Sequence, residues 1–303
     1  MTADGGRLVT ADRDPVFRFG VSQIVQDADW SETAREAERL GYDTFATTDH
    51  LGMTAPFPSL VAAASATERI GLATYLTNTS LWDPEVLARE VAGTDRLTGG
   101  RLAVGLHAGQ TGSTATASLT ARDKRKHLAE TVDVLDRLLR DPAHLPRPLS
   151  SPRPRLLIGA GEPEELELAA RRADTVCFLG AELPPGGGFV LIGPDEFAAQ
   201  VATVRARAAA LGRTPELNTG VKKIVVTDDR RAAAESLRPV LAPHLTTDQL
   251  LDLPSVLIGS HAEIADQIRR GHERYGLTSY MLLAAHLHDF APVIPLLRKG
   301  RPS

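Results

Sequence analysis

The sequence predicts a parallel (β/α)8 TIM barrel, and three observations support this fold class. Short apolar, β-branched runs alternate with longer Ala-, Leu-, Arg- and Glu-rich runs of helical period, as in parallel sheets with helical crossovers. The alternation yields eight strands, each followed by helical sequence, and 303 residues suit one such barrel. An open doubly wound sheet would bring a Gly-rich turn after the first strand, but residues 23–29 contain no glycine.

The first half of the chain contains four strand–helix pairs with clear boundary signals. Ser31 is expected to cap the first helix and Gly41 to end it, and Pro84 suits the first turn of the third. The expected strands are 17–23, 44–48, 70–76 and 101–106, and the expected helices are 31–40, 58–69, 84–97 and 122–140.

The second half repeats the pattern after an extended linker at 141–154, where five prolines disfavour helix and central strand. The segments 111–120 and 180–193 are expected to be loops, and 255–259 a short irregular piece. The expected strands are 155–158, 174–179, 217–226 and 279–284, and the expected helices are 163–172, 194–211, 230–241, a short segment before 255, 261–275 and 292–298.

Composition and charge narrow the classes of function. A net charge of −4 and the absence of a basic run interleaved with aromatics indicate no nucleic-acid or membrane partner. One cysteine, Cys177, excludes an intrachain disulfide and favours a cytoplasmic location. No apolar run approaches the length of a membrane span. We expect a flexible tail at 1–14, a single barrel domain at 15–303 and a small-molecule substrate.

The carboxyl ends of barrel strands share one face, and active sites are built there. We therefore examined only the residues at those ends. Six of the seven ends carry a polar or glycine-rich signature, and the seven are Ser22-Gln23, Asp49-His50, Thr77-Asn78, His107 to Gln110, Gly159 to Gly161, Leu179-Gly180 and Ala285-His286.

Asp49-His50 is the strongest candidate pair. Histidine exchanges protons near neutral pH, and the neighbouring carboxylate could orient it or bind a ligand hydroxyl. The alternative is a capping Asp49 beside a packed His50. Their place at the mouth of a barrel favours the catalytic interpretation.

Two further strand ends predict contacts with a ring-plus-phosphate ligand. Gly159-Ala160-Gly161 ends a strand and begins a helix, where free N–H groups suit a phosphate. A tight turn is the alternative, and acidic Glu162 and Glu164 favour it. Thr77-Asn78 could line a planar ring or simply enter a loop.

Two other features are not assigned a catalytic role. The alternate histidines His286 and His288 are the residues most suggestive of a metal, but no Cys or carboxylate cluster joins them at ligand spacing, so no metal is predicted. Cys177 lies in an apolar strand and is expected in the core.

Several motifs together resemble the bacterial luciferase-like superfamily, whose members are barrel enzymes that use FMN or the deazaflavin F420. The similarity is closest to the F420-dependent branch. It covers residues 17–180 well and the remainder weakly, and the motifs that carry it are Phe17 to Val21, Ala34 to Asp43, Thr48 to Gly52, Asp95 to Arg101 and Leu156 to Asp174.

The resemblance implies an oxidoreductase that transfers a hydride between F420 and a small organic substrate, and it implies a homodimer. His50 would lie beside the reactive face of the ring as acid/base, with Asp49 at its polar edge. Thr77-Asn78 would hold the family's cis non-proline bulge behind the ring. Gly159 to Gly161 would contact the phosphate or its chain.

The sequence departs from the family after the fourth strand, where the usual pattern is Gly-Leu-Gly-x-Gly-Trp. Here the corresponding residues are His107, Ala108, Gly109 and Gln110. Residues His107, Gly109 and Gln110 would then contact the cofactor, and His107 would either join catalysis or fill the site. Two alternatives therefore stay open: an FMN-dependent luciferase-like monooxygenase, and a cofactor-free relative, enzymatic or binding, with a refilled pocket.

Overall fold

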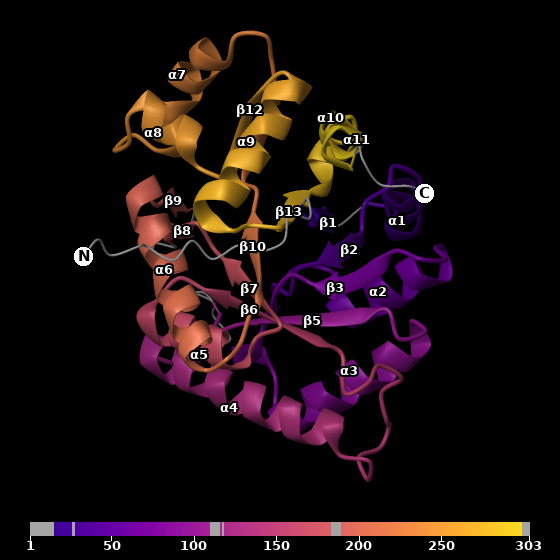
Figure 1. Ribbon diagram of the computed structural model, residues 1–303. Helices are drawn as coiled ribbons and strands as arrows, with labels where there is room; N and C mark the ends of the chain where they lie inside the picture. The colour runs from indigo at the N-terminus through magenta and orange to yellow at the C-terminus, as the bar shows by residue number, and fades with distance from the viewer. Residues whose placement is uncertain (1–14, 26–27, 110–115, 117, 183–188, 299–303) are drawn as a thin grey trace, which may run out of the picture.

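The computed structural model describes residues 15–25, 28–109, 116, 118–182 and 189–298, and a closed barrel lies at its centre (Figure 1). All neighbouring barrel strands are parallel, and the β1–β13 and β3–β5 pairings close the ring. In order around the barrel the strands are β1 (Arg18–Gln23), β2 (Thr44–Thr47), β3 (Gly71–Thr74), β5 (Leu102–His107), β6 (Arg155–Ala160), β7 (Thr175–Phe178), β10 (Glu216–Gly220) and β13 (Ser279–Leu283). The predicted fold class is confirmed.

Helices connect the strands and cover the outside of the barrel. Asp29, not the predicted Ser31, caps the first helix, because its carboxylate accepts the Glu32 N–H at 2.9 Å. The second helix begins at Pro56, two residues earlier than predicted. The helices are α1 (Trp30–Arg39), α2 (Pro56–Ser65), α3 (Pro84–Leu97), α4 (Ala121–Arg140), α5 (Pro163–Arg172), α6 (Pro194–Ala210), α7 (Arg230–Leu241), α8 (Thr247–Asp252), α9 (His261–Tyr275), α10 (Leu287–Phe290) and α11 (Val293–Arg298), with 3-10 turns η1 (Thr79–Leu81) and η3 (Ala284–His286).

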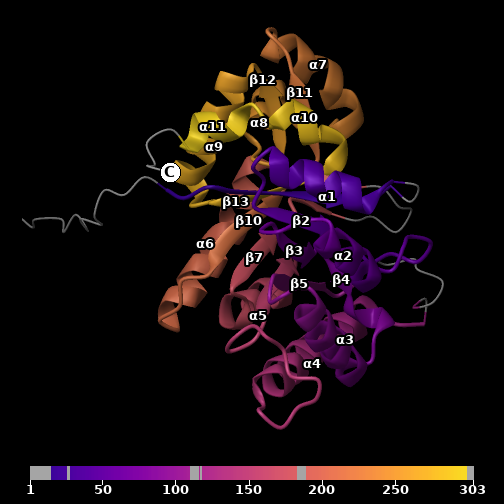
Figure 2. The same ribbon diagram turned by 90° about the vertical axis from the view of Figure 1, so that its right-hand side faces the viewer.

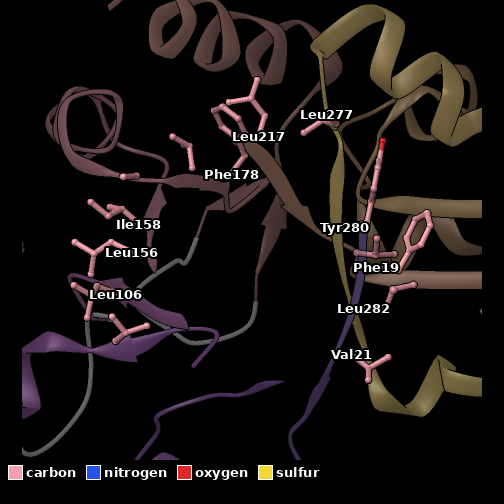
Figure 3. Packing of buried hydrophobic residues seen from close by; sticks show 14 of the residues in the cluster. Phe19, Val21, Leu106, Leu156, Ile158, Phe178, Leu217, Leu277, Tyr280 and Leu282 are labelled. Atoms are coloured by element: carbon pink, nitrogen blue, oxygen red, sulfur yellow. The ribbon is translucent and has the colours of Figure 1, made fainter. Parts of the chain in front are cut away.

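Side chains alternate along each strand between the helix-facing core and the barrel interior. On β1, Phe19 and Val21 are fully buried in the main apolar cluster between strands and helices, part of which Figure 3 shows. Gly20 faces the interior, where a Cβ on it would lie 2.6 Å from Met281 Cε. Ser22 shares that side and is the last residue of β1 to do so. The alternation therefore directs Ser22 into the mouth of the barrel.

The predicted strand 217–226 is two strands, and only the first belongs to the barrel. After β10, the Val221 N–H donates to Met281 and the Lys222 N–H donates to Ser255. The chain then forms β11 (Lys223–Val226), which pairs in parallel with β12 (Val256–Gly259) outside the barrel. The expectation of an irregular piece at 255–259 was wrong. A continuous apolar run does not show where its hydrogen-bonding partner changes.

The strands β11 and β12 share a second apolar cluster with α7 and α8. These elements gather at one end of the molecule, far from α3 and α4 (Figure 2). The long loop predicted at 180–193 includes a short antiparallel pair, β8 (Ala181–Glu182) and β9 (Val190–Leu191). The predicted linker at 141–154 contains no helix or strand, as expected. The tail at 1–14 lies outside the described residues, and the single domain at 15–303 stays a prediction.

Candidate functional site

The parallel barrel brings most predicted site residues to one face. Asp49 and His50 follow β2 after one intervening residue, Thr48, and His107 ends β5. Thr77 and Asn78 form the short strand β4, which pairs with the end of β5 and places Asn78 opposite His107. These five residues therefore surround one part of the barrel mouth. Gln110, the remaining candidate after β5, lies outside the described residues.

Asp49 connects two strand ends. Its side chain is 8% exposed, and its Oδ2 accepts Trp82 Nε1–H at 2.8 Å and the Asn78 N–H at 3.3 Å. Burial raises the pKa of Asp49, while both hydrogen bonds oppose that rise. Asp49 therefore positions the β4 segment. Sequence reasoning did not assign Trp82 a role, and its partner is 33 residues away, too far for a local pattern to reveal.

His50 and His107 face each other across the mouth. Their ring centroids lie 6.4 Å apart, with the ring planes 60° to one another. His107 Nδ1 accepts the Gly109 N–H at 3.0 Å, so its proton is on Nε2 in the neutral form. Burial, together with the charges of His50 and Lys124, lowers the pKa of His107 to about 3. His107 is therefore held neutral at pH 7.

Acidification is expected to destabilise the protein partly through His107. Below the ordinary histidine pKa of 6.5, the unfolded chain takes up a proton that the folded protein, with its His107 pKa of about 3, refuses. From pH 7 to pH 5, wild type should lose about 2 kcal/mol more unfolding free energy than His107→Gln. Urea denaturation at both pH values measures this, and parallel losses in the two proteins would contradict it.

Gly109 and Asn78 are packed against each other. A Cβ on Gly109, whose φ is +92°, would lie 2.2 Å from Asn78 Oδ1. That oxygen accepts the Ser80 N–H at 3.1 Å, and the Ser80 hydroxyl donates to Ala108 O at 2.7 Å. The Asn78 side chain is therefore bonded within its own loop. Its predicted contact with a ring stays a prediction.

The cis non-proline bond predicted at Thr77-Asn78 lies two residues earlier, between Tyr75 and Leu76. Leu76 faces the barrel interior, where it packs with Leu157 and Cys177. Cys177 is fully buried, as predicted for a core residue. The segment after β3 thus fills the barrel below the mouth.

A cavity of about 500 Å³ adjoins His107 at the ends of β5, β6 and β7. Gly109, Gly159 and Gly161 line it, whereas the Ala160 side chain is buried in the helix-facing core. The charged residues that line the cavity come from α4, from α5 and the residue before it, from β8 and from α6: Lys124, Arg125, Glu162, Glu165, Glu182 and Glu196. Its volume suits a small organic ligand.

The N–H groups that were predicted to bind a phosphate at the glycine turn already donate to a side chain. The Gly161 and Glu162 N–H groups donate to Glu165 Oε2 at 3.1 and 3.2 Å. Burial raises the pKa of Glu165. A phosphate at Gly161 would have to displace this carboxylate. Lys124, which is buried, and Arg125 are the cations that face the same cavity, so they are the better phosphate partners.

Two buried hydroxyls at strand ends support a ligand with a polar edge. Ser22 Oγ and Thr77 Oγ1 have no hydrogen-bond partner among the described residues. Buried polar atoms are rarely left unpaired, and each such group calls for an explanation. A ring whose polar edge reached the mouth would satisfy them. The described residues thus offer hydrogen-bonding groups for a planar ring at Ser22 and Thr77, and positive charge for a phosphate at Lys124 and Arg125.

The histidines near the carboxyl end of β13 have local partners. His286 lies 3.3 Å from Asp289, and His288 lies 3.7 Å from Glu36. Within the described ranges, no three His, Cys, Asp or Glu side chains gather as a metal ion would need. In the same ranges, no helix is long and apolar enough to cross a membrane.

Comparisons with known proteins agree with the barrel. The sequence profile of the luciferase-like monooxygenases matches residues 25–275. Monooxygenase RslO1 from Streptomyces bottropensis superposes with a TM-score of 0.71 at 22% identity, over 92% of this chain and 97% of that one.

Two solved structures named for F420 also share the fold. An F420-dependent secondary alcohol dehydrogenase, in complex with an F420-acetone adduct, has a TM-score of 0.74 at 16% identity, over 94% of this chain and 100% of that one. Coenzyme F420 dependent tetrahydromethanopterin reductase from Methanopyrus kandleri has a TM-score of 0.68 at 16% identity, over 94% and 98%. Identities this low carry the fold alone.

Proposed function

The chain belongs to the luciferase-like monooxygenase family, and we propose that it is an oxidoreductase that transfers a hydride between F420 and a small organic substrate. The observation that carries this proposal is the His50–His107 pair beside a cavity of about 500 Å³ at the strand ends. The cavity volume suits an aromatic cofactor, and the two cations that line the cavity, Lys124 and Arg125, suit a phosphate tail. The F420-dependent neighbours favour the deazaflavin.

A bound deazaflavin supplies the hydride chemistry, and the chain's residues supply binding, orientation and proton transfer. Gly109 and Gly159 line the cavity wall, with Asn78 and Leu76 packed against them, and Lys124 and Arg125 offer positive charge to the phosphate. Ser22 Oγ and Thr77 Oγ1 have hydrogen-bonding capacity for polar atoms of the ring.

His50 is proposed to exchange the proton that accompanies hydride transfer. Neutral His107 can donate from Nε2 to a substrate oxygen, because its Nδ1 is occupied by Gly109. Asp49 keeps the β4 segment in place through Trp82 and Asn78. This assigns a proton-transfer role to His50, a polarising role to His107 and a positioning role to Asp49.

Two alternatives have specific support. Structural neighbours named as monooxygenases, such as RslO1 and the long-chain alkane monooxygenase LadA, favour an FMN-dependent reaction on the same barrel. The acidic groups in the cavity and the His107 ring favour a relative that has lost its cofactor. The cavity is lined by four glutamates and two cations, and this excess of negative charge disfavours binding of an anionic cofactor.

Titration of the purified protein with F420 and with FMN, followed by ring fluorescence, is expected to give saturable binding of F420 in preference to FMN. His107→Gly provides the matched variant, since it restores the residue usual in the family and should tighten ring binding if His107 narrows the site. Preference for FMN would support the monooxygenase. Binding of neither, in wild type or variant, would leave only the cofactor-free function.

A further inference from the structure

Lys222 is placed at the mouth of the barrel, directly after β10. Val221 packs in the helix-facing core, whereas Asn218 and Gly220 face the interior, so alternation directs Lys222 inward. The contacts agree: a Cβ on Gly220 would lie 3.6 Å from Lys222 Nζ and 3.2 Å from the Tyr75 hydroxyl. The ammonium therefore lies above the side chains that fill the barrel.

This ammonium has no counter-charge in the part of the chain that the structure describes. No carboxylate there forms an ion pair with Lys222, and burial lowers the pKa of its ammonium. The chain pairs another buried cation closely: Arg153 contacts Asp136 at 2.7 Å and Asp174 at 2.6 Å. Burial of a cation without a partner is costly, and groups of this kind concentrate at functional sites.

The groups below Lys222 are neutral dipoles. The Tyr75 hydroxyl donates to Asn218 Oδ1 at 2.7 Å, and Asn218 Nδ2 donates to Ser279 at 2.8 Å. Burial raises the pKa of Tyr75 well above its usual value, so the phenol stays protonated. This network satisfies its own polar atoms without supplying a negative charge. The described residues therefore leave the charge of Lys222 to be balanced by a bound anion.

We propose that Lys222 binds a carboxylate of the small-molecule substrate, an inference that rests on the proposed function and narrows its substrate to organic acids. One negative charge matches one ammonium, whereas a phosphate dianion would leave a charge unbalanced among neutral neighbours. Lys222 is mostly buried but keeps some exposed surface, so a ligand entering the mouth can reach it. The carboxylate anchors the substrate end that does not react.

Thermal unfolding with small carboxylates tests the proposal without the cofactor. Acetate, hexanoate and benzoate are the probes, their amides are the neutral counterparts, and inorganic phosphate is the dianion. At least one carboxylate should raise the Tm of wild type while its amide does not. Lys222→Met should weaken that carboxylate's binding by about tenfold or more and, without ligand, unfold a few degrees higher, because it removes an unpaired buried charge.

Lys223→Met is the matched control, since it makes the same change one residue later, on the other face of the chain. It should respond to carboxylates as wild type does. No carboxylate response in wild type, equal responses in Lys222→Met, or protection by phosphate alone would each overturn the proposal. F420 and FMN titrations of Lys222→Met should match wild type. If wild type binds neither cofactor but keeps a Lys222-dependent carboxylate response, the proposed redox function fails and the carboxylate site stands.

Discussion

Replacing Gly105 with alanine is expected to lower the free energy of unfolding by about 3 kcal/mol, because β3 and β5 meet there with no room for a side chain. A Cβ on Gly105 would lie 2.3 Å from the Thr74 carbonyl oxygen and 2.6 Å from Leu76 Cδ2. The Leu76 side chain can shift, but the Thr74 oxygen is backbone. Thr74 Oγ1 also bonds both the Gly105 N–H and its carbonyl, so the two strands are held together.

Urea denaturation of Gly105→Ala measures the loss, with Gly161→Ala as control. A Cβ on Gly161, at the mouth of the same barrel, would meet only Leu179 Cδ1 at 3.8 Å, an ordinary contact. The control should therefore unfold close to wild type. Equal midpoints for the two variants would show that the strands relax around Gly105 and that barrel closure tolerates the added methyl group.

His50→Ala is expected to reduce turnover by about 10²- to 10⁴-fold, the usual contribution of a general acid or base. The variant should still fold, since the backbone bond from the Met53 N–H to His50 O survives the change. Cofactor affinity should stay close to that of wild type if His50 moves a proton and does not bind the ring. Steady-state rates with an organic acid substrate, together with the fluorescence titration, measure both quantities.

His288→Ala is the control for this experiment. The His288 side chain is 72% exposed on α10, and it lies 3.7 Å from Glu36. Its removal should leave turnover unchanged. Unchanged turnover in His50→Ala would remove His50 from proton transfer, and loss of cofactor binding without loss of folding would make it a binding residue.

Local sequence signals predicted most of the barrel before residue 217 well. The helices at 84–97 and 163–172 have the predicted bounds, because a proline begins each and the apolar period continues to its end. The signals were weaker after residue 217. There a single apolar run supplies two strands, and the change of partner from Met281 to Ser255 is a long-range contact.

The site shows the same contrast between what local sequence signals predict and what long-range contacts decide. Strand order alone placed Asp49, His50 and His107 on one face, because the ends of parallel strands must meet. The partner of each side chain did not follow from that placement. Trp82 donates a hydrogen bond to Asp49, and the Gly161 N–H donates one to Glu165. The ring centroids of His50 and His107 lie 6.4 Å apart.

The sequence by itself determined the alternation of strands and helices, and with it the barrel, its mouth and the family. These depend on period, capping residues and short motifs, which act over a few neighbouring residues. Only the tertiary structure decided which polar groups at the mouth are occupied and which are available. Lys222 illustrates the reason. Its ammonium lies near Gly220 and the Tyr75 hydroxyl, and no carboxylate among the described residues pairs with it. Such contacts between distant segments form only when the barrel closes.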